Sequence, residues 1–134
     1  MKALETALHI LLTGDTTLMT SVNAVYLAGI SKPTYPYVRV RKVSQSPPEY
    51  TYQSRILHRY QYDIAVIDKS ESKSAIQTAL ERIYALLELQ TISVTGYTCQ
   101  RITSLGDMPD MAELDDDGRM MNQVGASFEI VLAK

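Results

Sequence analysis

Apolar residues at helical spacing occupy the start of the chain. They recur at intervals of three and four, which predicts an amphipathic helix over residues 2–12. Gly14 is placed to end this helix, and Asp15 to cap a short second helical turn. The apolar positions of the two helices are Ala3, Leu4, Ala7, Leu8, Leu11 and Leu12, then Leu18, Met19 and Val22. The Gly, Ser, Lys and Pro residues of 29–36 predict an irregular connection.

From Tyr37 onward the period of the pattern changes to two. Val38 and Val40 alternate with polar residues, which predicts a strand with one dry and one wet face. The polar members of this strand are Tyr37, Arg39 and Arg41. Residues 44–54 contain Pro47 and Pro48, which cannot donate ladder hydrogen bonds, so this segment is predicted to be a loop between paired strands. The length of this loop favours a functional role.

A second alternating segment follows this loop and is predicted to pair antiparallel with the first strand. Its two faces differ sharply in polarity. The core side is expected to hold Ile56, His58, Tyr60, Tyr62, Ile64 and Val66. The wet side is expected to hold Arg55, Arg59, Gln61 and Asp63.

A further helix and two more strands follow in the sequence and complete the pattern. Ser70 or Ser72 is placed to cap the helix, which is expected to pack across the apolar sheet face. Residues 97–105 form a weaker strand at an edge or under partial cover, and an acidic loop over 106–118 precedes the last strand. The helix buries Ile76, Ala79, Leu80, Ile83 and Leu87. The last strand directs Val124, Ala126, Phe128, Ile130 and Leu132 to the core and Gln123, Ser127 and Glu129 outward.

These elements follow one another in the order α, short α, β, β, α, β, β. The order predicts an α+β fold, with an antiparallel sheet of about four strands and helices packed on one face. The 134 residues form one predicted domain, 1–134, because a chain of this length fits a single core.

Composition narrows the function classes. A net charge of −2 and a pI near 5.6 argue against stable nucleic-acid binding. No apolar run is long enough to span a bilayer, and we expect neither membrane contact nor a secretory signal. Cys99 is the single cysteine, which is typical of a reducing compartment, and is predicted to be a buried, inert thiol. The nine Tyr residues suit half-buried sheet faces and subunit interfaces.

Candidate catalytic and metal-binding patterns are weak. Glu113, Asp115, Asp117 and Gly118 follow the start of a calcium-loop pattern, but Val124 stands where the bidentate carboxylate is needed. A solvated loop or an acidic docking segment including Asp116 fits these residues better, and neighbouring methionines favour docking. The methionines are Met108, Met111, Met120 and Met121.

His9 and His58 have no carboxylate or nucleophile at motif spacing, and His58 is predicted to be a core or interface residue. We therefore expect neither an enzyme nor a cofactor.

The wet faces of the two predicted neighbouring strands carry a candidate site. Arg39, Arg41, Arg55 and Arg59 are expected to form one patch, moderated by Asp63 and Glu129. Three interpretations stay open: a solvated sheet face, a contact with a neighbouring subunit, or the wall of a channel.

Several phrases of the sequence, and their order, resemble one protein family. These are ALETALHILLTGDTTLMTSVNAVYLA, PTYPYVRVRKVSQSPPEY, HRYQYDIAVID running into the helix SKSAIQTALERIYALLE, and the closing VGASFEIVLA. Together they are similar to the tail completion proteins (tail terminator or tail-to-head joining proteins) of long, non-contractile phage and prophage tails. The acidic, methionine-rich loop departs from that pattern by being longer and more acidic.

The resemblance implies a non-enzymatic virion subunit, made in the host cytoplasm. It implies assembly as a ring, typically a hexamer, at the head-proximal end of the tail tube, where the ring stops tube growth and docks onto the head connector. DNA then passes transiently through the lumen. Arg39, Arg41, Arg55, Arg59, Gln61 and Asp63 become candidates for the lumen or subunit interface. Candidate docking residues are Pro47, Pro48, Tyr50, Tyr52, Asp115, Asp116 and Asp117.

Two other functions compete with this one. A cytoplasmic adaptor that binds a partner through the acidic loop would stay monomeric or dimeric. A small hydrolase or nucleotide-binding domain would need a deep pocket that collects polar residues from several strands, and His58 or Cys99 beside a carboxylate there would favour it.

Overall fold

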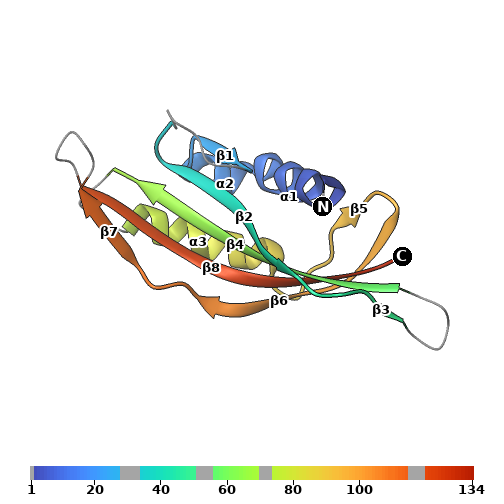
Figure 1. Ribbon diagram of the computed structural model, residues 1–134. Helices are drawn as coiled ribbons and strands as arrows, with labels where there is room; N and C mark the ends of the chain where they lie inside the picture. Colours follow the sequence, from blue (N-terminus) through green and yellow to red (C-terminus); the bar gives the residue numbers. More distant parts are fainter. Residues whose placement is uncertain (1, 28–33, 51–55, 70–73, 115–119) are drawn as a thin grey trace.

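The computed structural model describes residues 2–27, 34–50, 56–69, 74–114 and 120–134. Three helices pack on one face of a long, strongly twisted sheet (Figure 1). The helices are α1 (Lys2–Gly14), α2 (Thr16–Ser21) and α3 (Ser74–Leu87). The strands are β1 (Ala24–Tyr26), β2 (Tyr37–Gln45), β3 (Glu49–Tyr50), β4 (Ile56–Asp68), β5 (Ser93–Val94), β6 (Tyr97–Asp107), β7 (Met111–Leu114) and β8 (Met120–Ala133). Within the described ranges, no helix has the length and apolar character to cross a membrane.

The helical layer follows the predicted pattern. Leu4, Leu8 and Leu12 of α1 are fully buried. Asp15 caps α2 as predicted, because its carboxylate accepts a hydrogen bond from the Leu18 backbone N–H at 2.9 Å. In α3 every predicted core residue is buried, namely Ile76, Ala79, Leu80, Ile83 and Leu87. The predicted caps Ser70 and Ser72 lie outside the described residues.

A bidentate ion pair between Arg82 of α3 and Asp15, the cap of α2, links the two helices. The Nε and Nη2 atoms of Arg82 each lie 2.8 Å from one carboxylate oxygen of Asp15. The hydrogen bond from Arg82 is the main reason why the pKa of Asp15 lies below its ordinary value, and the Leu18 N–H acts in the same direction. Burial of the carboxylate opposes the shift. One side chain thus both caps a helix and joins two helices.

The sheet corrects the prediction of four antiparallel strands. It has eight strands in the order β1-β2-β4-β8-β6-β5, with β3 paired to β4 and β7 paired to β8, and β1 runs parallel to β2. The predicted antiparallel pairing of the two long alternating strands, β2 and β4, is confirmed. The four missed strands are only two to four residues long. Such short segments show no measurable period and become strands only by pairing with longer neighbours.

The segment predicted as a loop over 44–54 is partly strand. β2 continues to Gln45 after an irregularity between Lys42 and Ser44, and Glu49 and Tyr50 form β3. Pro47 and Pro48 lie between these strands, in agreement with their missing N–H groups. Residues 51–55 lie outside the described ranges.

The faces of the long strands are oriented as predicted. In β8 the five core positions Val124, Ala126, Phe128, Ile130 and Leu132 are at most 2% exposed. In β4 the residues Tyr60, Tyr62, Ile64 and Val66 are buried, whereas Ile56 and His58 at its start are only half-buried. Phe128 packs against Tyr84 of α3, with 5.4 Å between ring centroids. Alternation therefore predicted the helix-covered side of the sheet, although Ala65, Ile67, Val131 and Ala133 at the alternate positions are also buried.

The segment before β8 also departs from the prediction. β6 pairs with β8 as far as Asp107 and Ala126, and Met111–Leu114 then form β7 along the first residues of β8. Part of the predicted acidic loop is therefore a strand, because β8 extends beyond β6 and leaves backbone groups free for pairing. In β6, Ile102 is fully buried, but Cys99 is only half-buried, so the prediction of a buried thiol is wrong.

Candidate functional site

The helices leave one face of the sheet uncovered, and we call it the open face (Figure 1). It carries the outward residues of β2, β4, β8 and β6. Of the predicted arginine patch, Arg39, Arg41 and Arg59 lie on this face together with Gln61 and Asp63. Arg55 lies outside the described residues.

At one end of the open face the charges are matched in pairs. Arg59 Nε lies 2.9 Å from Glu49 Oε1, and Arg59 Nη1 lies 3.2 Å from Glu129 Oε1. Arg101 Nη2 of β6 lies 3.6 Å from the same Glu129 oxygen. The hydrogen bond to Glu49 raises the pKa of Arg59. We call these four residues the ion-paired half of the open face.

A second set of contacts lies at the middle of the open face. Arg41 Nη2 is 3.2 Å from Asp63 Oδ2, and the Ser127 hydroxyl donates to Asp63 Oδ1 at 2.6 Å. Ser44 and Gln61 are 3.4 Å apart at their polar ends. The predicted moderation by Asp63 and Glu129 is therefore present as direct ion pairs. Sequence reasoning missed the partners Glu49, Arg101 and Ser127, because cross-strand register decides which charges meet.

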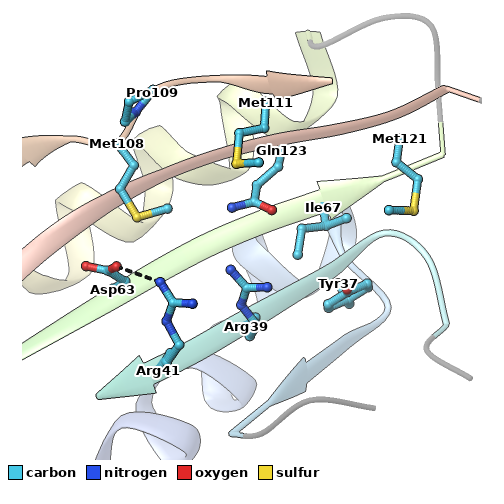
Figure 2. A pocket seen from close by; sticks show the side chains of 10 residues that line it. All are labelled: Tyr37, Arg39, Arg41, Asp63, Ile67, Met108, Pro109, Met111, Met121 and Gln123. Carbon is cyan, nitrogen blue, oxygen red and sulfur yellow. Dashed lines mark hydrogen bonds and ion pairs between the residues drawn. The ribbon is translucent and has the colours of Figure 1, made fainter. Parts of the chain in front are cut away.

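Beyond Asp63 the open face becomes a groove of about 550 Å³ that is rich in thioethers (Figure 2). Arg39 and Arg41 extend from β2 toward Met108 and Gln123 on the opposite side. We call this feature the methionine groove. Its lining residues are Tyr37, Arg39, Arg41, Asp63, Ile67, Met108, Pro109, Met111, Met121 and Gln123.

Met108 is held over the sheet by two small residues. Gly125 pairs with Ala65 across the β4–β8 ladder, and the Met108 backbone N–H donates to the Gly125 carbonyl at 2.9 Å. A Cβ atom on Gly125 would lie 2.7 Å from Met108 Cε and 2.8 Å from the Ile64 carbonyl oxygen. Gly125 therefore creates the depression that the Met108 side chain fills.

Arg39 is the unsatisfied group of the methionine groove. Its Nε is buried and has no hydrogen-bond partner, and within the described part of the chain its guanidinium makes no ion pair. Arg41, two residues away, has Asp63. Beside Arg39, burial raises the pKa of Tyr37 and favours its protonated phenol. A buried donor without an acceptor costs free energy. An acceptor such as a carboxylate, bound in the groove, would remove this cost.

Of the predicted docking segments, the structure describes Pro47, Pro48 and Tyr50, together with the β7–β8 ladder that precedes the acidic residues in the sequence. Pro47 and Pro48 are exposed, and Tyr50 of β3 is 76% exposed. The β7–β8 ladder closes with the pair Leu114 and Met120. Tyr52, Asp115, Asp116 and Asp117 lie outside the described residues.

The other candidate residues, His58 and the calcium-loop pattern, form no catalytic or metal-binding cluster within the described ranges. The rings in contact with His58 are Tyr60 and Tyr97, at 6.3 and 5.8 Å between centroids, so His58 joins an aromatic cluster. Among the described residues, no three His, Cys, Asp or Glu side chains are grouped to hold a metal ion. In the calcium-loop pattern, Glu113 belongs to β7, and Asp115, Asp117 and Gly118 lie outside the described residues.

Comparison with known proteins gives both a fold and a family. A chain from a structure titled "Virion of native gene transfer agent (GTA) particle" matches with a TM-score of 0.73 at 15% identity, over 98% of this chain and 95% of that chain. A second solved chain matches with a TM-score of 0.53 at 14% identity, over 96% and 91%. These likenesses show a shared fold. No curated protein matches the chain.

The family model described as "Tail completion protein gp17" matches residues 6–115, from the first helix through β7. The match confirms the resemblance drawn from the sequence phrases. This chain therefore belongs to the tail completion protein gp17 family and is a structural protein of phage tails.

Proposed function

We propose that this chain, acting as a single domain without enzymatic activity, assembles into a ring that caps the tail tube at its head-proximal end and joins the tail to the head. The observation that carries the proposal is the asymmetry of the sheet. One face is sealed by three helices, and the other is open along long strands and carries matched charges. A ring subunit needs both a stable body and a surface left free for neighbours or a lumen.

The charge balance of the open face suits a channel through which DNA passes. Four arginines, at positions 39, 41, 59 and 101, face three carboxylates, at positions 49, 63 and 129. Each phosphate contact adds affinity for DNA, so a strongly basic wall would hold the DNA in place. Carboxylates paired with the arginines keep the surface wet and weaken that attraction. Arg59, Gln61 and Asp63 are therefore our candidates for the lumen wall.

The projecting ends of the strands suit contacts beyond the subunit. Tyr50 presents a large ring with a polar tip, and residues of this kind are enriched at interfaces. Pro47, Pro48, Tyr50 and Tyr52 are our candidates for contact with a neighbour, the tube or the head connector. Asp115, Asp116 and Asp117, which follow β7 in the sequence, are further candidates.

The direct test is removal of the gene from its phage, followed by electron microscopy of the particles. We expect abnormally long tails and unattached heads, and rings of the purified protein or at the top of wild-type tails. Normal particles without the protein would refute the proposal. They would favour the alternative of an adaptor that binds a partner through its acidic segment and stays monomeric or dimeric.

Deletion of residues 47–52 tests whether this segment contacts a neighbouring subunit, the tube or the head connector. We expect the chain to fold with a nearly unchanged melting temperature, because the described part of this segment contributes no residue to the buried core. We expect weaker ring formation or tail attachment, measured by complementation of the gene deletion. Full complementation would exclude this segment from the contacts.

A further inference from the structure

We propose that the methionine groove of one copy binds the acidic segment Asp115–Asp117 of a second copy of this chain. This inference rests on the proposed ring and names the contact that links its subunits. The occupant is a short peptide segment that combines carboxylates with the apolar residue that precedes them in the sequence, Leu114.

The chemistry of the groove selects such a segment. Arg39 holds a buried Nε–H with no acceptor, and a guanidinium binds carboxylates through paired, charge-assisted hydrogen bonds. Met108, Met111 and Met121 line the opposite side, and flexible thioethers adapt to an apolar side chain. Met111 is 44% exposed, so part of this apolar surface stands free in a single copy. Guanidinium and thioethers together fit a segment that is both acidic and apolar.

The geometry favours a segment from a different copy. Along the β7–β8 ladder the groove is lined by Met111, Gln123 and Met121, and the last pair of the ladder is Leu114 and Met120. From Met111 to Leu114 the strand spans about 10 Å and runs away from Met108 and Pro109, which line the other end of the groove. Arg39 makes no ion pair within its own copy over the described residues.

The contact joins two different surfaces, a groove on one copy and a segment on the next. Such a head-to-tail contact repeats from copy to copy and closes into a ring when the rotation per step allows it. It would also divide the open face. The methionine groove would be covered by a neighbour, while the ion-paired half would stay exposed to the lumen.

The first experiment uses the full chain and a synthetic peptide of residues 110–119. The chain carries the substitutions Asp115→Lys, Asp116→Lys and Asp117→Lys, so that its own segment does not compete. A 15.0 kDa protein suits NMR, and methionine methyl signals report directly on Met108, Met111 and Met121. We expect saturable shifts of these three signals as the peptide is added. The absence of saturable shifts, or shifts confined to other methionines, would overturn the proposal.

Matched variants test the role of charge. Adding Arg39→Glu to the same chain should weaken peptide binding by at least about tenfold, because a central arginine becomes a repelling carboxylate. Arg101→Glu changes the charge equally but lies on the ion-paired half, so binding should stay within about twofold. A peptide with Asn in place of each Asp should bind poorly. Equal affinity for the Arg39→Glu and Arg101→Glu chains would contradict the proposal.

A charge swap connects the groove to the ring. The Arg39→Glu chain and the triple-lysine chain should each fail to complement the gene deletion, and the chain with all four substitutions should recover part of the activity. If rings form but Arg39→Glu leaves them intact, the groove proposal fails and the proposed function stands. If the peptide binds in the groove but neither rings nor tail defects are found, the proposed function fails and the contact between copies stands.

Discussion

The two faces of the sheet differ although the same strands build them. Along β8, Phe128 is fully buried under the helices, and the next side chain, Glu129, is 29% exposed and shared by two arginines. The helix-covered face is apolar and closely packed, whereas the open face is a set of paired charges with a groove at one end. Stability is thus concentrated on one face, which leaves the other free to carry contacts.

The open face itself contains two different surfaces. In its ion-paired half each described charge has a partner on a neighbouring strand. In the methionine groove Arg39 has none among the described residues, and the thioethers of Met108, Met111 and Met121 line the opposite side. A satisfied surface gains little from a partner, and an unsatisfied one gains more. Substitutions on the covered face should therefore affect folding most, and those in the groove should affect assembly most.

Phe128→Ala should have the largest effect on stability. Phe128 is fully buried against Tyr84, so truncation should lower the free energy of unfolding by about 3–5 kcal/mol, through lost burial and the cavity left behind. Urea denaturation of the purified chain measures this loss. Phe128→Leu is the matched control and should retain most of the stability. A loss well under ~1 kcal/mol for Phe128→Ala would contradict the contrast between the faces.

Gly125→Ala tests a rigid position on the open face. The added methyl group would meet the Ile64 carbonyl oxygen and Met108 Cε, and backbone cannot move aside easily. We expect a loss of about 1–3 kcal/mol and displaced Met108 methyl signals in NMR. Combining the change with Met108→Ala should recover only part of the loss, because the backbone contact remains. Full recovery would show that Met108 alone fixes the requirement for glycine.

Asp15→Ala tests the helical layer and its dependence on pH. Loss of the cap should cost about 1 kcal/mol at neutral pH, measured by urea denaturation. The pKa of Asp15 is lowered in the folded chain, first by the Arg82 hydrogen bond, so the carboxylate stabilises the fold above its unfolded value of 3.8. This stabilisation is lost as pH falls through the lower folded pKa. The difference from wild type should therefore shrink below pH 3.8, and a constant difference would contradict this account.

Glu129→Gln should have the smallest effect on folding. Glu129 and its partners Arg59 and Arg101 are partly exposed, so the change should cost less than about 1 kcal/mol, and less again in high salt. The same change leaves Arg101 without a carboxylate and leaves Arg59 with Glu49 alone, so the proposed lumen becomes more basic. We expect slower DNA passage, measured as delayed release of DNA from particles. A stability loss as large as that of Phe128→Ala would remove the distinction between the faces.

Much of the fold could be predicted because its signals are local. The period of two in β4 and β8 and the spacing of three and four in α1 and α3 identified most of their buried residues, whereas Ile56 and His58 of β4 are only half-buried. The role of Asp15 as a helix cap could also be predicted from the neighbouring residues. The short strands could not be predicted from the sequence, since β3 and β5 hold two residues each and form only by pairing with neighbouring strands. Part of the candidate site was predicted as well, since alternation placed Arg39, Arg41 and Arg59 on the wet side.

The sequence by itself determined which side of each long strand and helix is apolar, because those periods are read within a few neighbouring residues. Only the tertiary structure decided which polar groups meet. Arg41 and Asp63 are 22 residues apart and Asp63 and Ser127 are 64 apart, and strand register alone brings them together. The same register pairs Gly125 with Ala65, and the Met108 side chain packs on Gly125. Among the described residues, no acceptor lies beside Arg39 Nε. Periodicity is a local property of the chain, whereas pairing depends on distances that exist only once the strands are aligned.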